Sequence, residues 1–144
     1  MSFEDLPENV AEIPISTPGL GADLVDLLLT TEDRRAESLF LVPADEGGLL
    51  FPGIGAITFG GMDWRCSAEE RETGLANIAS MGIPQAIVGF ASENWIAPHL
   101  LRQWRDAVNA AFAGSRTTLV GVYVVNLDDV LEISTGPLPA LWAA

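Results

Sequence analysis

The clearest hydrophobic pattern in the chain lies between residues 97 and 114. Its apolar positions recur at steps of three and four residues, as on one face of an α-helix. They are Ala97, Leu100, Leu101, Trp104, Val108, Ala111 and Phe112, and Gly114 ends the pattern. The opposite face carries Arg102, Arg105, Asp106 and Asn109, of which Arg102 and Asp106 are spaced for an i,i+4 ion pair. We expect this helix to bury Trp104 against a sheet.

Start signals and apolar stripes predict two further helices. In "STPGLGADLVDLLLTT", Thr17 is a good N-cap and Pro18 suits the first helical position. The apolar stripe of this helix consists of Leu20, Leu24, Leu27 and Leu28, opposite Asp23 and Asp26. In "SAEERETGLANIASMG", Ser67 and Glu70 have the spacing of a capping box, and Gly82 supplies the stop. Only the second half of this helix is apolar, so we expect its first half to project beyond the core.

Five runs are typical of β-strands. They are "SLFLV" (38–42), "LLFPGIGAITF" (49–59), "QAIVGFA" (85–91), "TLVGVYVV" (118–125) and "VLEIS" (130–134). Between the first helix and the first strand, "EDRRAE" is expected to be a solvated continuation or a loop. Alternating helices and strands indicate an α/β fold. We expect a single α/β domain over residues 1–135. Its mixed sheet has a central parallel β-α-β-α-β unit and antiparallel hairpins at the ends, and an apolar C-terminal tail (136–144) follows.

The charge balance excludes several classes of partner. The chain has 20 acidic residues against 7 basic ones, all of them arginine, for a net charge of −13. Such a charge repels nucleic-acid phosphates and anionic lipid, so we expect neither partner. No apolar run approaches the roughly 18 residues that span a bilayer. The acidic start "MSFEDLPENV" lacks the basic and apolar segments of a secretory signal, and we expect a cytoplasmic protein.

Recognisable catalytic and cofactor motifs are weak or missing. One cysteine and one histidine cannot form a disulfide or a Cys/His zinc set. We expect neither a metal nor a cofactor, with a carboxylate site for magnesium or calcium as the alternative. The glycines of "GIGAITFGG" lack the spacing of a nucleotide-binding loop and fit a bulge or close strand packing better. Cys66 and His99 are the one thiol and imidazole pair, but the helical period places His99 away from the apolar stripe. An exposed surface histidine is therefore the better interpretation.

A site, if there is one, is expected where parallel strands end and helices begin. In open α/β sheets, ligands bind beyond the carboxyl ends of the strands, near the amides of helix N-termini. The loops "GGMDWRCS" and "SENWIAPH", joined there by "VNLDD", bring polar and aromatic residues to this edge. The candidate ligand-binding residues are Asp63, Trp64, Arg65, Ser67, Glu93, Asn94 and Trp95. For Trp64 and Trp95, packing over the sheet edge is the favoured interpretation and a ligand shelf is the alternative.

The sequence supports two hypotheses of function and leaves open whether the protein is an enzyme. The first is a non-enzymatic acidic module that acts through protein contacts, with a protein partner or a homo-oligomer. In that case Leu138, Leu141 and Trp142 of the apolar tail would form the partner contact. The second is a small enzyme or ligand-binding domain that binds a small anionic ligand at the strand-end loops, with Arg65 as the anion anchor.

Overall fold

A five-stranded mixed sheet lies at the centre of the structure, with the strand order β2-β1-β3-β4-β5. The computed structural model describes residues 12–138. The strands are β1 (Ser38–Ala44), β2 (Ile57–Phe59), β3 (Gln85–Ala91), β4 (Thr118–Val125) and β5 (Val130–Glu132). β3 and β4 run parallel, whereas β1 is antiparallel to β2 and β3, and β5 is antiparallel to β4. The predicted α/β fold with a mixed sheet is thus confirmed.

The predicted β-α-β-α-β unit corresponds to β2, α3 (Ala68–Ala79), β3, α4 (Pro98–Ala113) and β4. Its three strands share one direction, because β1 is antiparallel to both of its neighbours. β1 lies between β2 and β3, so the first hairpin supplies both an edge strand and an internal strand. All seven residues of β1 are buried, as an internal strand requires, whereas β2 is three residues long and partly exposed.

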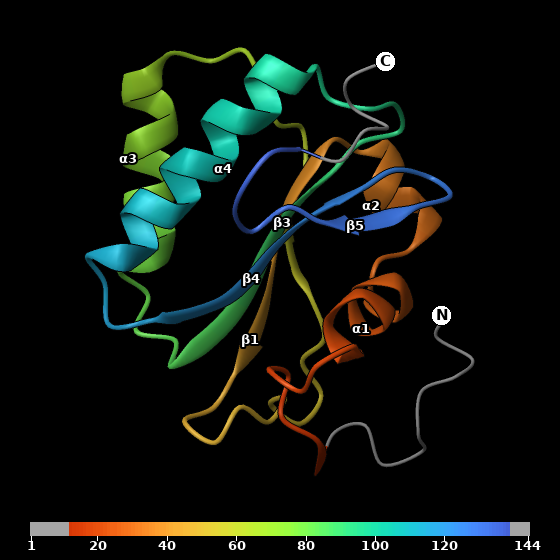
Figure 1. Ribbon diagram of the computed structural model, residues 1–144, viewed down its shortest axis with the longest axis vertical. Coiled ribbons are helices and arrows are strands. Elements are labelled where there is room, and N and C mark those ends of the chain that lie inside the picture. The colour runs from red at the N-terminus through yellow and green to blue at the C-terminus, as the bar shows by residue number, and fades with distance from the viewer. Residues whose placement is uncertain (1–11, 139–144) are drawn as a thin grey trace.

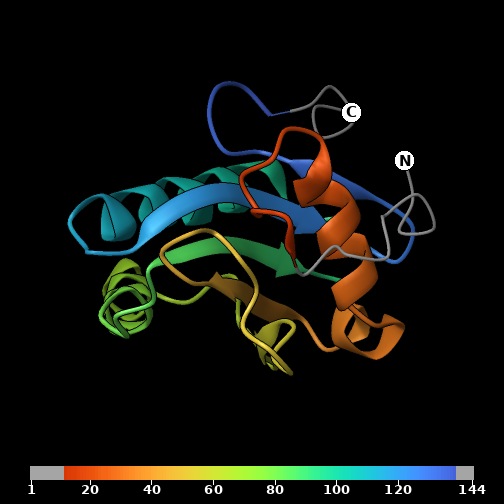
Figure 2. The ribbon, with the colours of Figure 1, turned by 90° about the horizontal axis from the view of Figure 1, so that it is seen from below.

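Helices cover both faces of the sheet (Figures 1 and 2). α3 and α4 lie side by side on one face, and the larger core cluster fills the space between them and the sheet. α1 (Leu20–Leu28) packs on the other face over a second cluster around Phe40 and Tyr123. Among the helices of residues 12–138, none has the length and apolar character needed to span a bilayer.

α4 buries the predicted stripe, including Leu101, Trp104, Val108 and Phe112. The prediction for Arg105 was wrong, because this side chain is buried rather than exposed. Its guanidinium donates hydrogen bonds to the carbonyl of Gly136 and to the carboxylate of Asp106. Asp106 therefore pairs with its neighbour Arg105 and not with Arg102. A segment distant in sequence covers this face of the helix and supplies a polar partner for the arginine.

The N-terminal helix differs from its prediction. α1 begins at Leu20 with Gly19 as N-cap, at a φ of 81°, rather than at Thr17. Asp23 is only 2% exposed and Leu27 is 41% exposed, which reverses the predicted faces at these two positions. Gly21 explains the close approach of the helix, because a Cβ there would lie 2.1 Å from the hydroxyl oxygen of Tyr123. A further short helix, α2 (Thr31–Arg35), is capped by Thr30 and includes the first four residues of "EDRRAE", where a solvated continuation or a loop was expected.

The C-terminal tail is described only as far as Leu138. Leu138 is partly buried and packs against the α3/α4-side core of its own chain. Leu141 and Trp142 lie outside the described residues. A contact of this tail with a partner stays a prediction.

Candidate functional site

The loop of residues 60–67 connects β2 to α3 and is held by hydrogen bonds. The amides of Gly61 and Met62 donate to the carbonyls of Ala36 and Glu37, both at 2.8 Å. The Asp63 carboxylate accepts from the amide of Arg65 at 3.0 Å, within its own loop. Ser67 then caps α3, as predicted, by accepting from the amide of Glu70 at 3.1 Å, but the return bond of the predicted capping box, from the Ser67 amide to the Glu70 side chain, is not formed. These hydrogen bonds restrict the backbone conformation of the loop and so fix the positions from which its side chains extend.

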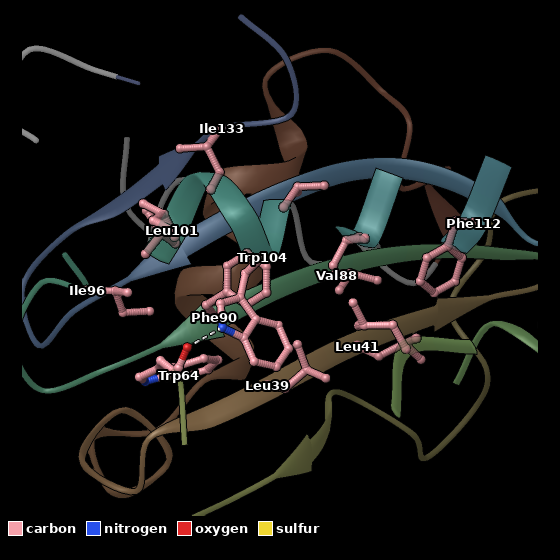
Figure 3. Close-up of a cluster of buried hydrophobic side chains, with 14 of the residues drawn as sticks. Leu39, Leu41, Trp64, Val88, Phe90, Ile96, Leu101, Trp104, Phe112 and Ile133 are labelled. Atoms are coloured by element: carbon pink, nitrogen blue, oxygen red, sulfur yellow. Dashed lines mark hydrogen bonds between the residues drawn. The ribbon is translucent and has the colours of Figure 1, made fainter. Parts of the chain in front are cut away.

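Trp64 belongs to an aromatic cluster in the core. Its ring meets those of Trp104 and Phe90 edge to face, with centroids 5.4 and 5.8 Å away (Figure 3). The indole nitrogen of Trp104 donates to the carbonyl of Trp64 at 2.8 Å. This geometry supports the packing interpretation of Trp64, whose indole is enclosed rather than presented as a shelf.

Glu37 joins three separate segments and was not among the residues predicted for the site. Its carboxylate accepts hydrogen bonds from the indole of Trp64 at 3.1 Å, the hydroxyl of Ser92 at 2.8 Å and the amide of Glu93 at 3.1 Å. Its backbone has a φ of 50°, which costs a residue with a Cβ of the order of 1–2 kcal/mol. A glutamate before an apolar strand carries no local signal of either feature.

The candidate residues from the two strand-end loops largely come together. A hollow of about 300 Å³, which we call the edge hollow, is lined by Asp63, Trp64, Arg65, Asn94 and Trp95 of the predicted set. Its other lining residues are Glu37, Met62, Ser92, Ile96, Ala97 and Leu100. Ser67 and Glu93 do not line it: Ser67 serves as the cap of α3, and the exposed Glu93 carboxylate lies 4.0 Å from Arg35.

The third loop that was expected at this edge does not line the edge hollow. Buried Arg34 donates to the carbonyls of Asn126 and Leu127, both at 3.3 Å, and to the Asp26 carboxylate at 2.9 Å. These bonds tie the turn between β4 and β5 to α1 and α2. Within the edge hollow, the carboxylates of Glu37 and Asp63 already accept hydrogen bonds from the protein, so both are engaged without a ligand.

A second hollow lies on the other side of the same loop. This space, which we call the α3 groove, has a volume of about 440 Å³ and lies between α3, β1, β2 and the loop. Its lining consists of Leu39, Phe59, Gly61, Met62, Asp63, Cys66, Glu70, Arg71, Gly74, Leu75, Asn77, Ile78 and Trp104. Leu39, Leu75 and Trp104 are buried and form its floor, while the exposed Asp63, Glu70 and Asn77 lie at its mouth. Met62 and Asp63 line both hollows.

Arg71 places a positive charge within this mostly apolar groove. Its guanidinium carbon lies over the Trp104 ring, 5.8 Å from the centroid, in a cation–π contact. Its Nε atom is buried and has no hydrogen-bond partner within residues 12–138. Leaving such a donor unsatisfied costs about 1–3 kcal/mol. A sequence signal existed, because Arg71 falls on the same helical stripe as Leu75 and Ile78, where an apolar residue would be expected.

Cys66 stands beside Arg71 in the α3 groove. Burial raises the pKa of its thiol, and the carboxylates of Glu70 and Asp63 raise it further, while Arg71 lowers it. His99, the imidazole of the thiol and imidazole pair named above, is exposed and does not line the groove. Residues 12–138 contain no grouping of three or more His, Cys, Asp and Glu side chains placed to hold a metal ion.

Comparison with known proteins found no family model, no curated protein and no solved structure that matches this chain.

Proposed function

We propose that this protein is a ligand-binding domain that holds a small apolar molecule in the α3 groove. The observation that carries the proposal is the groove itself, whose volume of about 440 Å³ lies within the roughly 300–1,000 Å³ of small-molecule sites. Like such sites, it combines an apolar floor with few polar groups. Of the two hypotheses drawn from the sequence, this proposal is closest to the ligand-binding domain. It places the ligand in the α3 groove and not in the edge hollow.

Gly74 supports this proposal independently. It lies in the interior of α3, where glycine costs about 1 kcal/mol relative to alanine. A Cβ at this position would meet nothing within 4 Å, and no positive φ requires a glycine there. Gly74 lines the groove, so a large side chain at this position would take up part of its space.

The raised pKa of the Cys66 thiol, and the absence of His99 from the groove, favour binding over catalysis. The thiolate is the reactive form of cysteine, and burial raises the pKa of this thiol above its usual value. A base must lie within hydrogen-bond reach of its nucleophile, and His99 lies outside the groove. The module that acts through protein contacts, and the cytoplasmic location, stay predictions from the sequence.

Cys66 offers a direct test, because it is the only cysteine of the chain and lines the groove. The rate of Cys66 alkylation by iodoacetamide is measured while the neutral probe octanol is titrated. We expect octanol to slow the reaction in a saturable manner, because it would cover the thiol. Each variant is compared with its own rate without octanol.

The matched variants are Gly74→Trp, which fills the groove, and Gly74→Ala, which does not. Octanol should protect Cys66 in the alanine variant and lose this effect in the tryptophan variant, with circular dichroism confirming that both are folded. Absence of protection in the parent protein, or equal protection in both variants, would contradict the proposal.

A further inference from the structure

We infer that the ligand of the α3 groove is an amphiphile with one carboxylate, which pairs with Arg71 while its apolar body extends toward Ile78. This inference rests on the proposed function and adds the chemistry of the ligand. It assigns the anion anchor to Arg71 and not to Arg65, the anchor predicted from the sequence.

The guanidinium of Arg71 has no carboxylate partner within residues 12–138. The contact with the Trp104 ring is made at 5.8 Å from the guanidinium carbon to the ring centroid, and the N–H groups of a guanidinium lie in its plane. The buried Nε is one of these donors and has no partner within residues 12–138. A carboxylate matches the planar arrangement of the guanidinium donors and forms charge-assisted hydrogen bonds with them. Arg71 lines the groove and forms no ion pair within residues 12–138, so a ligand carboxylate in the groove would pair with its charge.

The position of Arg71 along the groove orients the ligand. Arg71 and Cys66 lie at the N-terminal end of α3, where the helix dipole also favours negative charge. Phe59, Leu75 and Ile78 line the groove without a charged group among them. The charged end of an amphiphile is therefore stabilised beside Arg71, and its chain is stabilised by the apolar lining.

The mouth of the groove limits the charge of the ligand. The carboxylates of Asp63 and Glu70 line the groove near Arg71, and both residues are exposed. A phosphate monoester carries a charge of about −1.5 to −2 at neutral pH and would meet stronger repulsion from these groups than a carboxylate. A ligand with a single carboxylate is therefore favoured beside Arg71, because the exposed carboxylates of Asp63 and Glu70 repel it less than they would repel a phosphate.

The experiment compares octanoate, octanol and octyl phosphate by titration calorimetry on the full chain at neutral pH. We expect Arg71→Gln to weaken octanoate binding by about tenfold or more, the loss typical of a charge-assisted hydrogen bond. Octanol binding should be unchanged in this variant, which also shows that the groove is intact. Glu70→Gln should strengthen octanoate binding, since it removes a repulsive charge, and should leave octanol unaffected.

The outcomes separate this inference from the proposed function. If octanol binds but Arg71→Gln leaves octanoate binding unchanged, the carboxylate assignment is overturned and the groove remains a ligand site. Tighter binding of octyl phosphate than of octanoate would also overturn it. If neither octanol nor octanoate binds the parent protein, the proposed function itself fails.

Discussion

Replacing Glu37 with alanine removes the acceptor of three hydrogen bonds that join β1, the loop of residues 60–67 and the end of β3. Two of the donors, on Trp64 and Ser92, belong to residues that are only 8% and 4% exposed, so water replaces the carboxylate poorly. The third donor is the amide of exposed Glu93, which water reaches. At about 1–2 kcal/mol for each buried donor, we expect Glu37→Ala to destabilise the protein by about 2–4 kcal/mol.

A glycine variant separates the hydrogen bonds from the backbone conformation. Glu37→Gly loses the same three bonds but relieves the positive φ of 50°. The left-handed conformation costs alanine about 1–2 kcal/mol, and glycine loses part of this advantage through greater chain entropy on unfolding. The glycine variant should therefore be more stable than the alanine variant by about 1 kcal/mol, the reverse of the usual order.

The assay is urea denaturation at constant pH, followed by tryptophan fluorescence and far-UV circular dichroism. Coincident transitions of the two signals would justify a two-state free energy of unfolding. A loss below about 0.5 kcal/mol for Glu37→Ala would refute the argument, because surface substitutions commonly reach that value. An alanine variant at least as stable as the glycine variant would refute the part that concerns φ.

Three further predictions concern other parts of the molecule. Trp104→Ala should lower the free energy of unfolding in urea by about 3–5 kcal/mol, because it empties a site that is 2% exposed, and a loss below 1 kcal/mol would contradict its place in the core. Tyr123 is the only tyrosine of the chain, and burial and then Glu132 raise its pKa from 10.0 to about 12, so an alkaline absorbance titration should show that midpoint and Glu132→Gln should lower it. Since the folded state holds the phenol neutral, its contribution to stability is complete below pH 10 and is lost as the pH rises toward 12; a midpoint near 10 would contradict this. Gly74→Ala should raise the free energy of unfolding by up to about 1 kcal/mol, and a lower melting temperature would show that the helix needs this glycine.

Local patterns in the sequence predicted the elements and much of the fold. The three- and four-residue spacing of Leu101, Trp104, Val108 and Phe112 identified α4 and its buried face. The apolar run of residues 85–91 matches β3 residue for residue, and Ser67 caps α3 as expected. These features depend on neighbours within a few positions, because helix and strand periodicity and capping are local properties of the backbone. The order of the elements was then enough to indicate the α/β class.

Contacts between distant residues decided the rest. Arg105 looked solvent-exposed by periodicity, but the carbonyl that accepts its hydrogen bond lies 31 positions away. Glu37 accepts from Ser92, 55 positions away, and no local pattern marks such a pairing. The loop of residues 60–67 was singled out from the sequence, yet the α3 groove depends on the position of β1 beside β2 and on the packing of α3 against α4. Long-range pairing of this kind depends on how whole surfaces fit together, so only the tertiary structure places Arg71 over the ring of Trp104, brings Cys66 to the same groove and leaves the space beside Gly74 open.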